Sequence, residues 1–152
     1  MRRVLVLLAT LAVLVGTAGA PADARSTKAE RRYAHQAFAA TNAHRVHNGL
    51  RALEPNHCVK HWAVRQAKLM AQQERIFHQD LNRVMRDCGL STAGENVAYG
   101  FPSGKSVVND GWMHSEGHRA NILYPKFRLM GIAARKGHNG SWYVAQVFGG
   151  KG

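Results

Sequence analysis

Hydrophobic and polar positions follow a helical pattern through the first half of the chain. Apolar side chains recur every three or four positions from Tyr33 to Ala40, within a stretch of about residues 28–48. Asn48-Gly49 then interrupts the pattern with residue types that commonly end a helix. These features predict a first helix that buries one face.

A stronger apolar stripe follows, from Val59 to Ala71, with lysine, arginine and glutamine on the opposite face. It predicts an amphipathic helix over about residues 57–75, and Asn56 is a suitable N-cap. Residues 81–88 are expected to form a short third helix or turn, because a glycine follows them directly.

The last third of the chain changes to a strand-like pattern. Residues 128–135 and 141–148 are rich in β-favouring side chains, and Gly137-His138-Asn139-Gly140 between them predicts a hairpin turn. A further helix is expected over about 105–113. Helices first and a hairpin last indicate an α+β fold in which the sheet is stacked against helices.

The first 24 residues have the pattern of a secretory signal peptide. A basic start precedes the apolar run Val4–Val15, and Ala22-Asp23-Ala24 matches the small-x-small cleavage pattern. The run is too short for a membrane span, and no other stretch is long and apolar enough. We therefore expect a signal peptide over 1–24, a flexible lead-in over 25–31, one domain over 32–150 and secretion of the mature chain.

Secretion determines the redox environment of the two cysteines. Cys58 and Cys88 are the only cysteines, and an oxidising exterior favours a disulfide between them, the alternative being two free buried thiols.

The whole chain has a formal charge of +12; without 1–24 it has 19 lysines and arginines against 8 acidic residues, or +11. This balance favours anionic cell-wall polymers or phospholipid head groups as partners. Specific nucleic-acid binding is not expected, because no nucleic-acid-binding motif accompanies the charge.

Polar chemistry concentrates in one segment, residues 111–123, which holds two imidazoles, a carboxylate, a hydroxyl and an amide. We expect His78, Glu95 and His118 to meet in one cleft, with Ser115 or Glu116 as further members. Such a group can bind a divalent metal, exchange protons near neutral pH, or form a structural hydrogen-bond network.

Neighbouring polar residues have simpler explanations. Asn96 is expected to tie a loop to the backbone, while Ser115 and Asn121 are expected to cap a short helix over 117–123. Asp80 can orient the His78 imidazole, but a cap for the helix that starts near Leu81 is the simpler role.

Three motifs in order resemble a known family: Gly94-Glu95-Asn96-Val97, the segment 117–122 and Met130-Gly131-Ile132-Ala133. The sequence resembles the CAP superfamily, also called the SCP/PR-1-like domain, in its short secreted bacterial form. The resemblance covers about residues 30–150. It implies a three-layer α-β-α sandwich with an antiparallel sheet and a cleft lined by two histidines and acidic residues.

His78 and His118 match the two family histidines, and Glu95 matches the first family glutamate. The second family glutamate falls at Ser115 in this chain, and Glu116 follows it. Members of the family have been linked to sterol or fatty-acid binding, so the resemblance also implies a lipid as a ligand.

Two functions remain open from the sequence. The first is a secreted, non-enzymatic binding module whose cleft binds a divalent metal, zinc for example, and a lipid or cell-wall ligand. The alternative is a metal-dependent peptidase or cell-wall hydrolase, in which His78 and His118 hold zinc and Glu95 is the catalytic base that deprotonates the bound water.

Overall fold

The computed structural model describes residues 26–152, so the predicted signal peptide over 1–24 lies outside the described residues. The chain forms, in order, α1 (Lys28–His47), β1 (Glu54–Pro55), α2 (His57–Gln73), α3 (Leu81–Cys88), β2 (Thr92–Tyr99), α4 (Gly104–Ser106), η2 (Val107–Gly111), η3 (Trp112–His114), α5 (Glu116–Ile122), β3 (Leu129–Lys136) and β4 (Trp142–Gly150).

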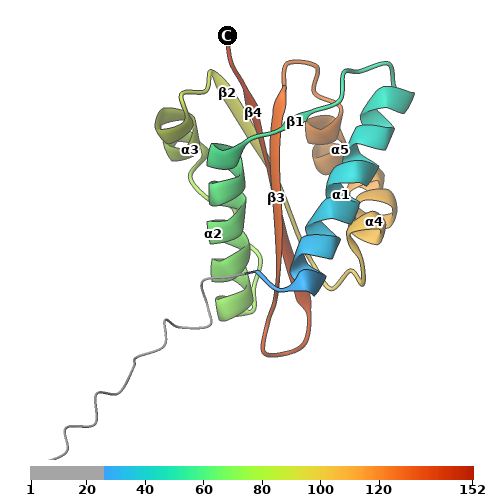
Figure 1. The fold of residues 1–152 in the computed structure, drawn as a ribbon, viewed down its shortest axis with the longest axis vertical. Coiled ribbons are helices and arrows are strands. Elements are labelled where there is room, and N and C mark those ends of the chain that lie inside the picture. The colour runs from blue at the N-terminus through green and yellow to red at the C-terminus, as the bar shows by residue number, and fades with distance from the viewer. Residues whose placement is uncertain (1–25) are drawn as a thin grey trace, which may run out of the picture.

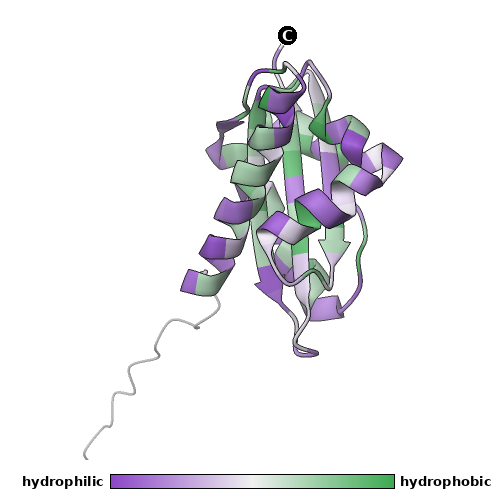
Figure 2. Cartoon of the chain, turned by 90° about the vertical axis from the view of Figure 1, so that its right-hand side faces the viewer, coloured by the Kyte–Doolittle hydropathy of each residue, from purple (hydrophilic) through white to green (hydrophobic). Residues whose placement is uncertain are grey.

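One sheet with strand order β1-β3-β4-β2 separates two layers of helices. Helices α2 and α3 cover one face, and α1, α4 and α5 cover the other (Figure 1). Figure 2, which looks onto the second layer, shows largely hydrophobic strands behind helices that carry hydrophilic stretches. The three-layer α-β-α sandwich inferred from the motifs is therefore confirmed.

Each face of the sheet has its own hydrophobic core. Met130, Ile132 and Ala134 belong to the core under α1, whereas Ala133 belongs to the core under α2. This division follows from the alternation of side chains along a strand. Gly131 has a special role on the α2 face, because a Cβ there would lie 2.3 Å from the backbone nitrogen of Lys60. Glycine therefore lets α2 lie directly against β3.

The sheet is antiparallel except at one short pairing that the sequence did not predict. β2 pairs with β4 and β3 pairs with β4, both antiparallel, and the hairpin turn lies where the glycines indicated. Glu54 and Pro55, however, pair in parallel with Leu129 and Met130. Two residues carry no periodic pattern, so this strand depends on the tertiary contact that forms it.

The helix ends agree with their capping residues. Asn56 caps α2, and Gly89 ends α3 in the left-handed conformation. The described part of the expected lead-in over 25–31 is shorter than predicted, because α1 already begins at Lys28. Thr27 and Glu30 form a reciprocal capping box there, which satisfies amides of the first turn.

Two segments before the hairpin differ from the sequence-based expectation. The loop to which Asn96 was assigned is part of β2, because the whole stretch from Thr92 to Tyr99 pairs with β4. The helix expected over 105–113 is instead a short α-turn, a π-turn and a 3-10 turn. Its irregular path ends with Trp112 almost completely buried, where the indole nitrogen donates to the Val97 carbonyl at 3.3 Å.

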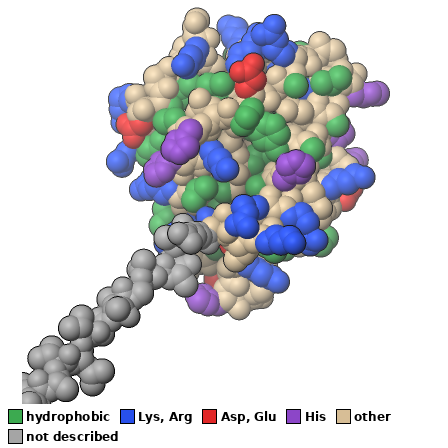
Figure 3. Space-filling model, viewed as in Figure 1, with side chains coloured by type: hydrophobic (Ala, Val, Ile, Leu, Met, Phe, Trp, Pro, Cys, Tyr) green, Lys and Arg blue, Asp and Glu red, His purple; other side chains and the backbone are tan. Residues whose placement is uncertain are grey.

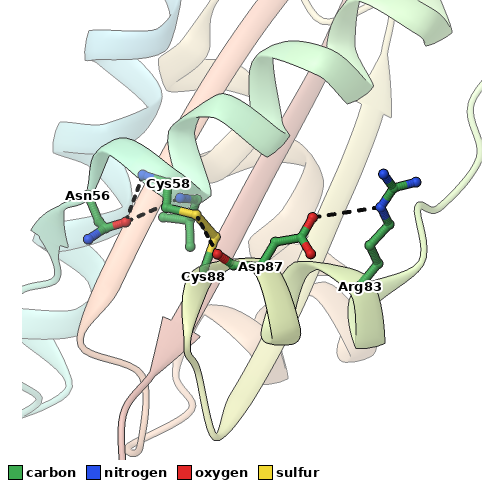
Figure 4. The surroundings of a disulfide bond; sticks show 6 residues. Asn56, Cys58, Arg83, Asp87 and Cys88 are labelled. Atoms are coloured by element: carbon green, nitrogen blue, oxygen red, sulfur yellow. Dashed lines mark hydrogen bonds and ion pairs between the residues drawn. A yellow bond between two sulfur atoms is a disulfide. The ribbon is translucent and has the colours of Figure 1, made fainter.

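Cys58 and Cys88 form the predicted disulfide, with Cα atoms 5.7 Å apart. The bond joins the first turn of α2 to the last residue of α3 (Figure 4). Asn56 caps α2 beside it by accepting hydrogen bonds from the Cys58 and Val59 amides. The bridge therefore fixes α3, and with it the segment that leads from α2 to α3, against the domain.

Candidate functional site

Glu95 and His78 form the centre of the candidate site. Glu95 lies in β2 with a fully buried side chain, and its Oε1 is 2.8 Å from Nδ1 of His78. His78 lies between α2 and α3, and its side chain is 62% exposed. A buried carboxylate therefore holds one nitrogen of a ring whose other edge faces solvent.

Gln79 completes the surroundings of the Glu95 carboxylate. Its backbone amide donates to Oε1 at 3.2 Å, and its side-chain amide donates to Oε2. Burial raises the pKa of Glu95, while the hydrogen bonds from His78 and Gln79 oppose the rise. Sequence reasoning assigned Gln79 no role, although its place beside His78 was the available signal. Its own Oε1 is buried without a protein partner in the described chain.

His118, on α5, is held by a different partner. Its Nδ1 lies 2.8 Å from Oγ of Ser115, and its ring centroid is 6.5 Å from that of Trp112. Burial lowers the pKa of His118, and the charge of nearby His78 lowers it further. Both effects favour the neutral form of the His118 imidazole.

A buried amide network holds α5 against the sheet. Asn121 donates to the Glu95 carbonyl and to the side chain of Asn96, each at about 3 Å. Asn96 in turn donates to the His118 carbonyl and to Gln146. Gln146 then donates to Thr41 in α1. Because these bonds join the backbones of Glu95 and His118, the network sets the distance between the two halves of the site.

The structure corrects two expected roles and the expected location of a third residue. Ser115 stands at the N-cap position of α5 but makes no capping bond, because its hydroxyl contacts His118 instead. Asn121 belongs to the network rather than to a cap, and Asn96 lies in a strand rather than a loop. Asp80 caps α3 by accepting from the amides of Asn82 and Arg83, so the simpler of its two roles is confirmed.

The other candidate carboxylate stands apart from the rings. Glu116 is exposed in the first turn of α5 and forms no hydrogen bond or ion pair with either imidazole. His78, Glu95, His118 and Ser115 are thus the predicted members for which the structure shows site contacts.

Arg45 is a further buried residue to which the motifs gave no role. It lies in α1 and donates to four backbone carbonyls, those of Arg51, Ile122, Tyr124 and Phe127. Burial lowers its pKa. Since two of these carbonyls belong to the end of α5 and the turn after it, Arg45 secures the helix that carries His118.

The side chains of the site allow a test of whether it can hold a metal ion. Both imidazoles have Nδ1 engaged, by Glu95 and by Ser115, which is how metal-binding histidines are commonly oriented. Their Nε2 atoms have no protein partner within residues 26–152. No group of three or more His, Cys, Asp or Glu side chains in that range is arranged to hold an ion. Two imidazole nitrogens are therefore the protein ligands available here, fewer than the three protein ligands of catalytic zinc enzymes.

Comparison with known proteins assigns the chain to a family. Residues 38–148 match the model of the cysteine-rich secretory protein family, CAP. The match covers most of the chain, so the protein belongs to the CAP family, as its motifs indicated. Within residues 26–152, no helix has the length and apolar character that a membrane span requires.

Three relatives show the range of similarity. The uncharacterized protein YkwD of Bacillus subtilis (strain 168) is 34% identical over 116 residues, 72% of this chain and 44% of the relative. An extracellular SCP-domain protein from Bacillus anthracis superposes with a TM-score of 0.69 at 26% identity, over 80% of this chain and 41% of that one. A cysteine-rich secretory protein from Staphylococcus aureus gives 0.70 at 24% identity, with 84% and 41% covered. The chain spans less than half the length of these relatives.

Proposed function

We propose that this protein is an exported, non-enzymatic CAP binding module. It holds a divalent cation, with zinc as the first candidate, through Nε2 of His78 and Nε2 of His118, and it binds an anionic cell-wall or lipid ligand there. The observation that carries the proposal is the pair of imidazoles whose Nδ1 atoms are both fixed by hydrogen bonds while their Nε2 atoms have no protein partner.

Tautomer chemistry supports this assignment. A neutral imidazole that donates its Nδ1 proton to an acceptor presents a lone pair at Nε2, which is the form that binds metal. The Glu95 carboxylate is such an acceptor for His78, and the Ser115 hydroxyl can accept from His118. Burial lowers the pKa of His118 and so favours the neutral ring, which is the form that binds a cation.

The hydrolase alternative has less support from the same geometry. It requires Glu95 to take a proton from metal-bound water, but Oε1 and Oε2 already accept hydrogen bonds from His78 and Gln79. It also requires a third protein ligand, and Ser115 stands where the family resemblance places a carboxylate. A cation held by two rings keeps open positions for water or ligand, which suits binding.

Charge and export suggest the class of ligand. The chain carries 21 lysines and arginines against 9 acidic residues, which favours anionic polymers and anionic lipid head groups. A cation in the cleft provides a further positive centre for a phosphate or carboxylate. The expected signal peptide and the extracellular description of the Bacillus anthracis relative support export.

Co-sedimentation tests this proposal. The mature chain is mixed with insoluble cell-wall material or with phosphatidylglycerol vesicles, in zinc or in EDTA. We expect zinc to increase the bound fraction of the parent but not of the His78→Ala/His118→Ala variant. Equal binding by both proteins under both conditions refutes the metal-dependent part. Turnover of peptide or peptidoglycan that zinc supports and Glu95→Gln abolishes, with the fold kept, establishes the hydrolase instead.

A further inference from the structure

Among the described residues, the outer edge of β3 has no neighbouring strand over most of its length. β1 pairs only with Leu129 and Met130, whereas β4 covers the opposite edge from Leu129 to Lys136. Residues 131–136 therefore form an open edge about 20 Å long, at roughly 3.3 Å per residue. An open edge presents main-chain donors and acceptors that can pair with another chain.

The register identifies the free main-chain groups. The Asn56 amide donates to the Met130 carbonyl at 3.3 Å, so the main-chain groups of Met130 point toward β1. Because successive residues point to opposite edges, Ile132 and Ala134 also face this side, while Gly131 and Ala133 bond to β4. The Ala134 carbonyl accepts from Arg135. The amides of Ile132 and Ala134 have no protein acceptor among the described residues.

This edge is the floor of a groove between α1 and α2. The groove has a volume of about 570 Å³, and β3 lines it from Met130 to Arg135. Its walls are mainly apolar, with Ala34 and Phe38 from α1 and Val64 from α2. Figure 3 shows hydrophobic side chains between the two helices, with basic and histidine side chains around them. A floor of unpaired backbone between apolar walls suits one extended chain.

The rim of the groove is positively charged. Arg31, Lys60 and Arg135 line it, and Glu30 is the single acidic residue among the described residues of the lining. Glu30 lies 3.6 Å from Arg135, so that pair largely balances itself. Arg31 and Lys60 remain as cations without an acidic neighbour in the lining, which favours a partner that carries carboxylates.

We propose that the open edge of β3 binds an extended acidic and apolar polypeptide segment, which adds to the sheet as a strand beside β3, in line with β1. Main-chain hydrogen bonds to Ile132 and Ala134 give affinity, apolar side chains contact the groove walls, and carboxylates meet Arg31 and Lys60. The site is separate from the histidine pair, because none of His78, Glu95 and His118 lines the groove. A second copy fits poorly, since its own β3 edge is equally recessed and its rim has the same charge.

Amide exchange measured by NMR gives the most direct test. The mature ¹⁵N-labelled protein is titrated with a synthetic peptide of eight alternating valine and glutamate residues. Exchange at Ile132 and Ala134 is expected to slow roughly tenfold at nine-tenths saturation, while Gly131 and Ala133 change little because β4 already protects them. Saturating binding that leaves Ile132 and Ala134 unprotected overturns the proposal.

Two modified peptides separate strand addition from adsorption. One carries N-methyl groups on its odd residues and the other on its even residues, so only one of them blocks the edge that pairs with β3. We expect one peptide to bind like the parent peptide and the other to lose most of its affinity. Equal affinity of the two peptides contradicts strand addition and assigns the groove to apolar adsorption.

Charge reversal and occupant controls complete the design. Arg31→Glu/Lys60→Glu is expected to weaken peptide binding roughly tenfold, whereas Arg86→Glu on exposed α3 serves as the remote control and leaves it unchanged. Equal weakening in both proteins contradicts the rim assignment.

Concentration-dependent dimerisation that protects the same amides without peptide assigns the edge to a second copy. Phosphatidylglycerol vesicles that displace the peptide and protect neither amide assign the groove to lipid. Each of these last two results overturns the proposal.

Discussion

Oγ of Ser115 lies 2.8 Å from Nδ1 of His118, at the position where the family resemblance places a glutamate. A serine hydroxyl orients the ring as a glutamate carboxylate would, but it adds no negative charge and is a poor ligand for zinc. This contact explains why the described chain has two oriented imidazoles without a group of three or more metal-binding side chains.

Restoring a carboxylate at this position should strengthen metal binding. We expect Ser115→Glu to raise zinc affinity by about 10–100-fold, because a charged group then orients His118 or joins the ligands directly. Isothermal titration of metal-free protein measures the change. Glu116→Gln is the matched control, since Glu116 is exposed and forms no hydrogen bond or ion pair with either ring, and it should leave affinity unchanged. A Ser115→Glu protein with parental affinity would show that the cleft lacks room for a third donor.

The pKa of His118 predicts a pH dependence of stability. Burial lowers this pKa below the ordinary value of 6.5, so between the folded pKa and 6.5 the unfolded chain binds a proton that the folded chain refuses. The stabilising contribution of His118 is therefore present above pH 6.5 and is lost as the pH falls through the folded pKa.

Urea unfolding in EDTA between pH 7.5 and 5 tests this dependence. The free energy of unfolding of the parent should fall more steeply with decreasing pH than that of His118→Asn, whose side chain can still contact Ser115. Parallel pH profiles of the two proteins would mean that His118 titrates alike in the folded and unfolded states.

The amide network predicts a large loss of stability at Asn96. This residue is fully buried, and its side chain bonds to His118, Gln146 and Asn121. Asn96→Ala removes one hydrogen bond from each of these partners and should cost about 2–4 kcal/mol. Asn82→Ala in exposed α3 is the control and should stay within about 0.5 kcal/mol. Denaturant melts measure both, and a small loss at Asn96 would show that water replaces its bonds.

The disulfide is expected to contribute to the free energy of unfolding. Cys58 and Cys88 are 30 residues apart, so the bridge should contribute about 3–4 kcal/mol by restricting the unfolded chain. Cys58→Ser/Cys88→Ser should lower the unfolding free energy by this amount and should be insensitive to reducing agent, unlike the parent. A double variant as stable as the oxidised parent would contradict the estimate.

The helix boundaries could be predicted because their signals are local. Asn56 and Gly89 act on amides and carbonyls within one turn, so the residue types alone indicate where α2 begins and α3 ends. The strand β1 lacks such a signal, since Glu54 and Pro55 become a strand only through their pairing with β3.

The residues of the candidate site could likewise be predicted only in part. His78, Glu95 and His118 were found through motifs spread over the chain, and the structure brings Glu95 to one ring and the charge of His78 near the other. The roles of Gln79 and Gln146 depend on contacts across 16 and 50 residues, which no local pattern records. A lone glutamine within the apolar strand β4 was the one hint of the buried network.

Zinc titration of untagged, metal-free mature protein tests the metal site most directly. The parent should bind one zinc ion per chain, and His78→Ala/His118→Ala should lose that binding by at least about tenfold in affinity. His114→Ala/His138→Ala removes two exposed histidines and should bind as the parent does. If the site double variant retains the parental affinity, or if the control pair loses as much, the two oriented imidazoles are not the zinc site.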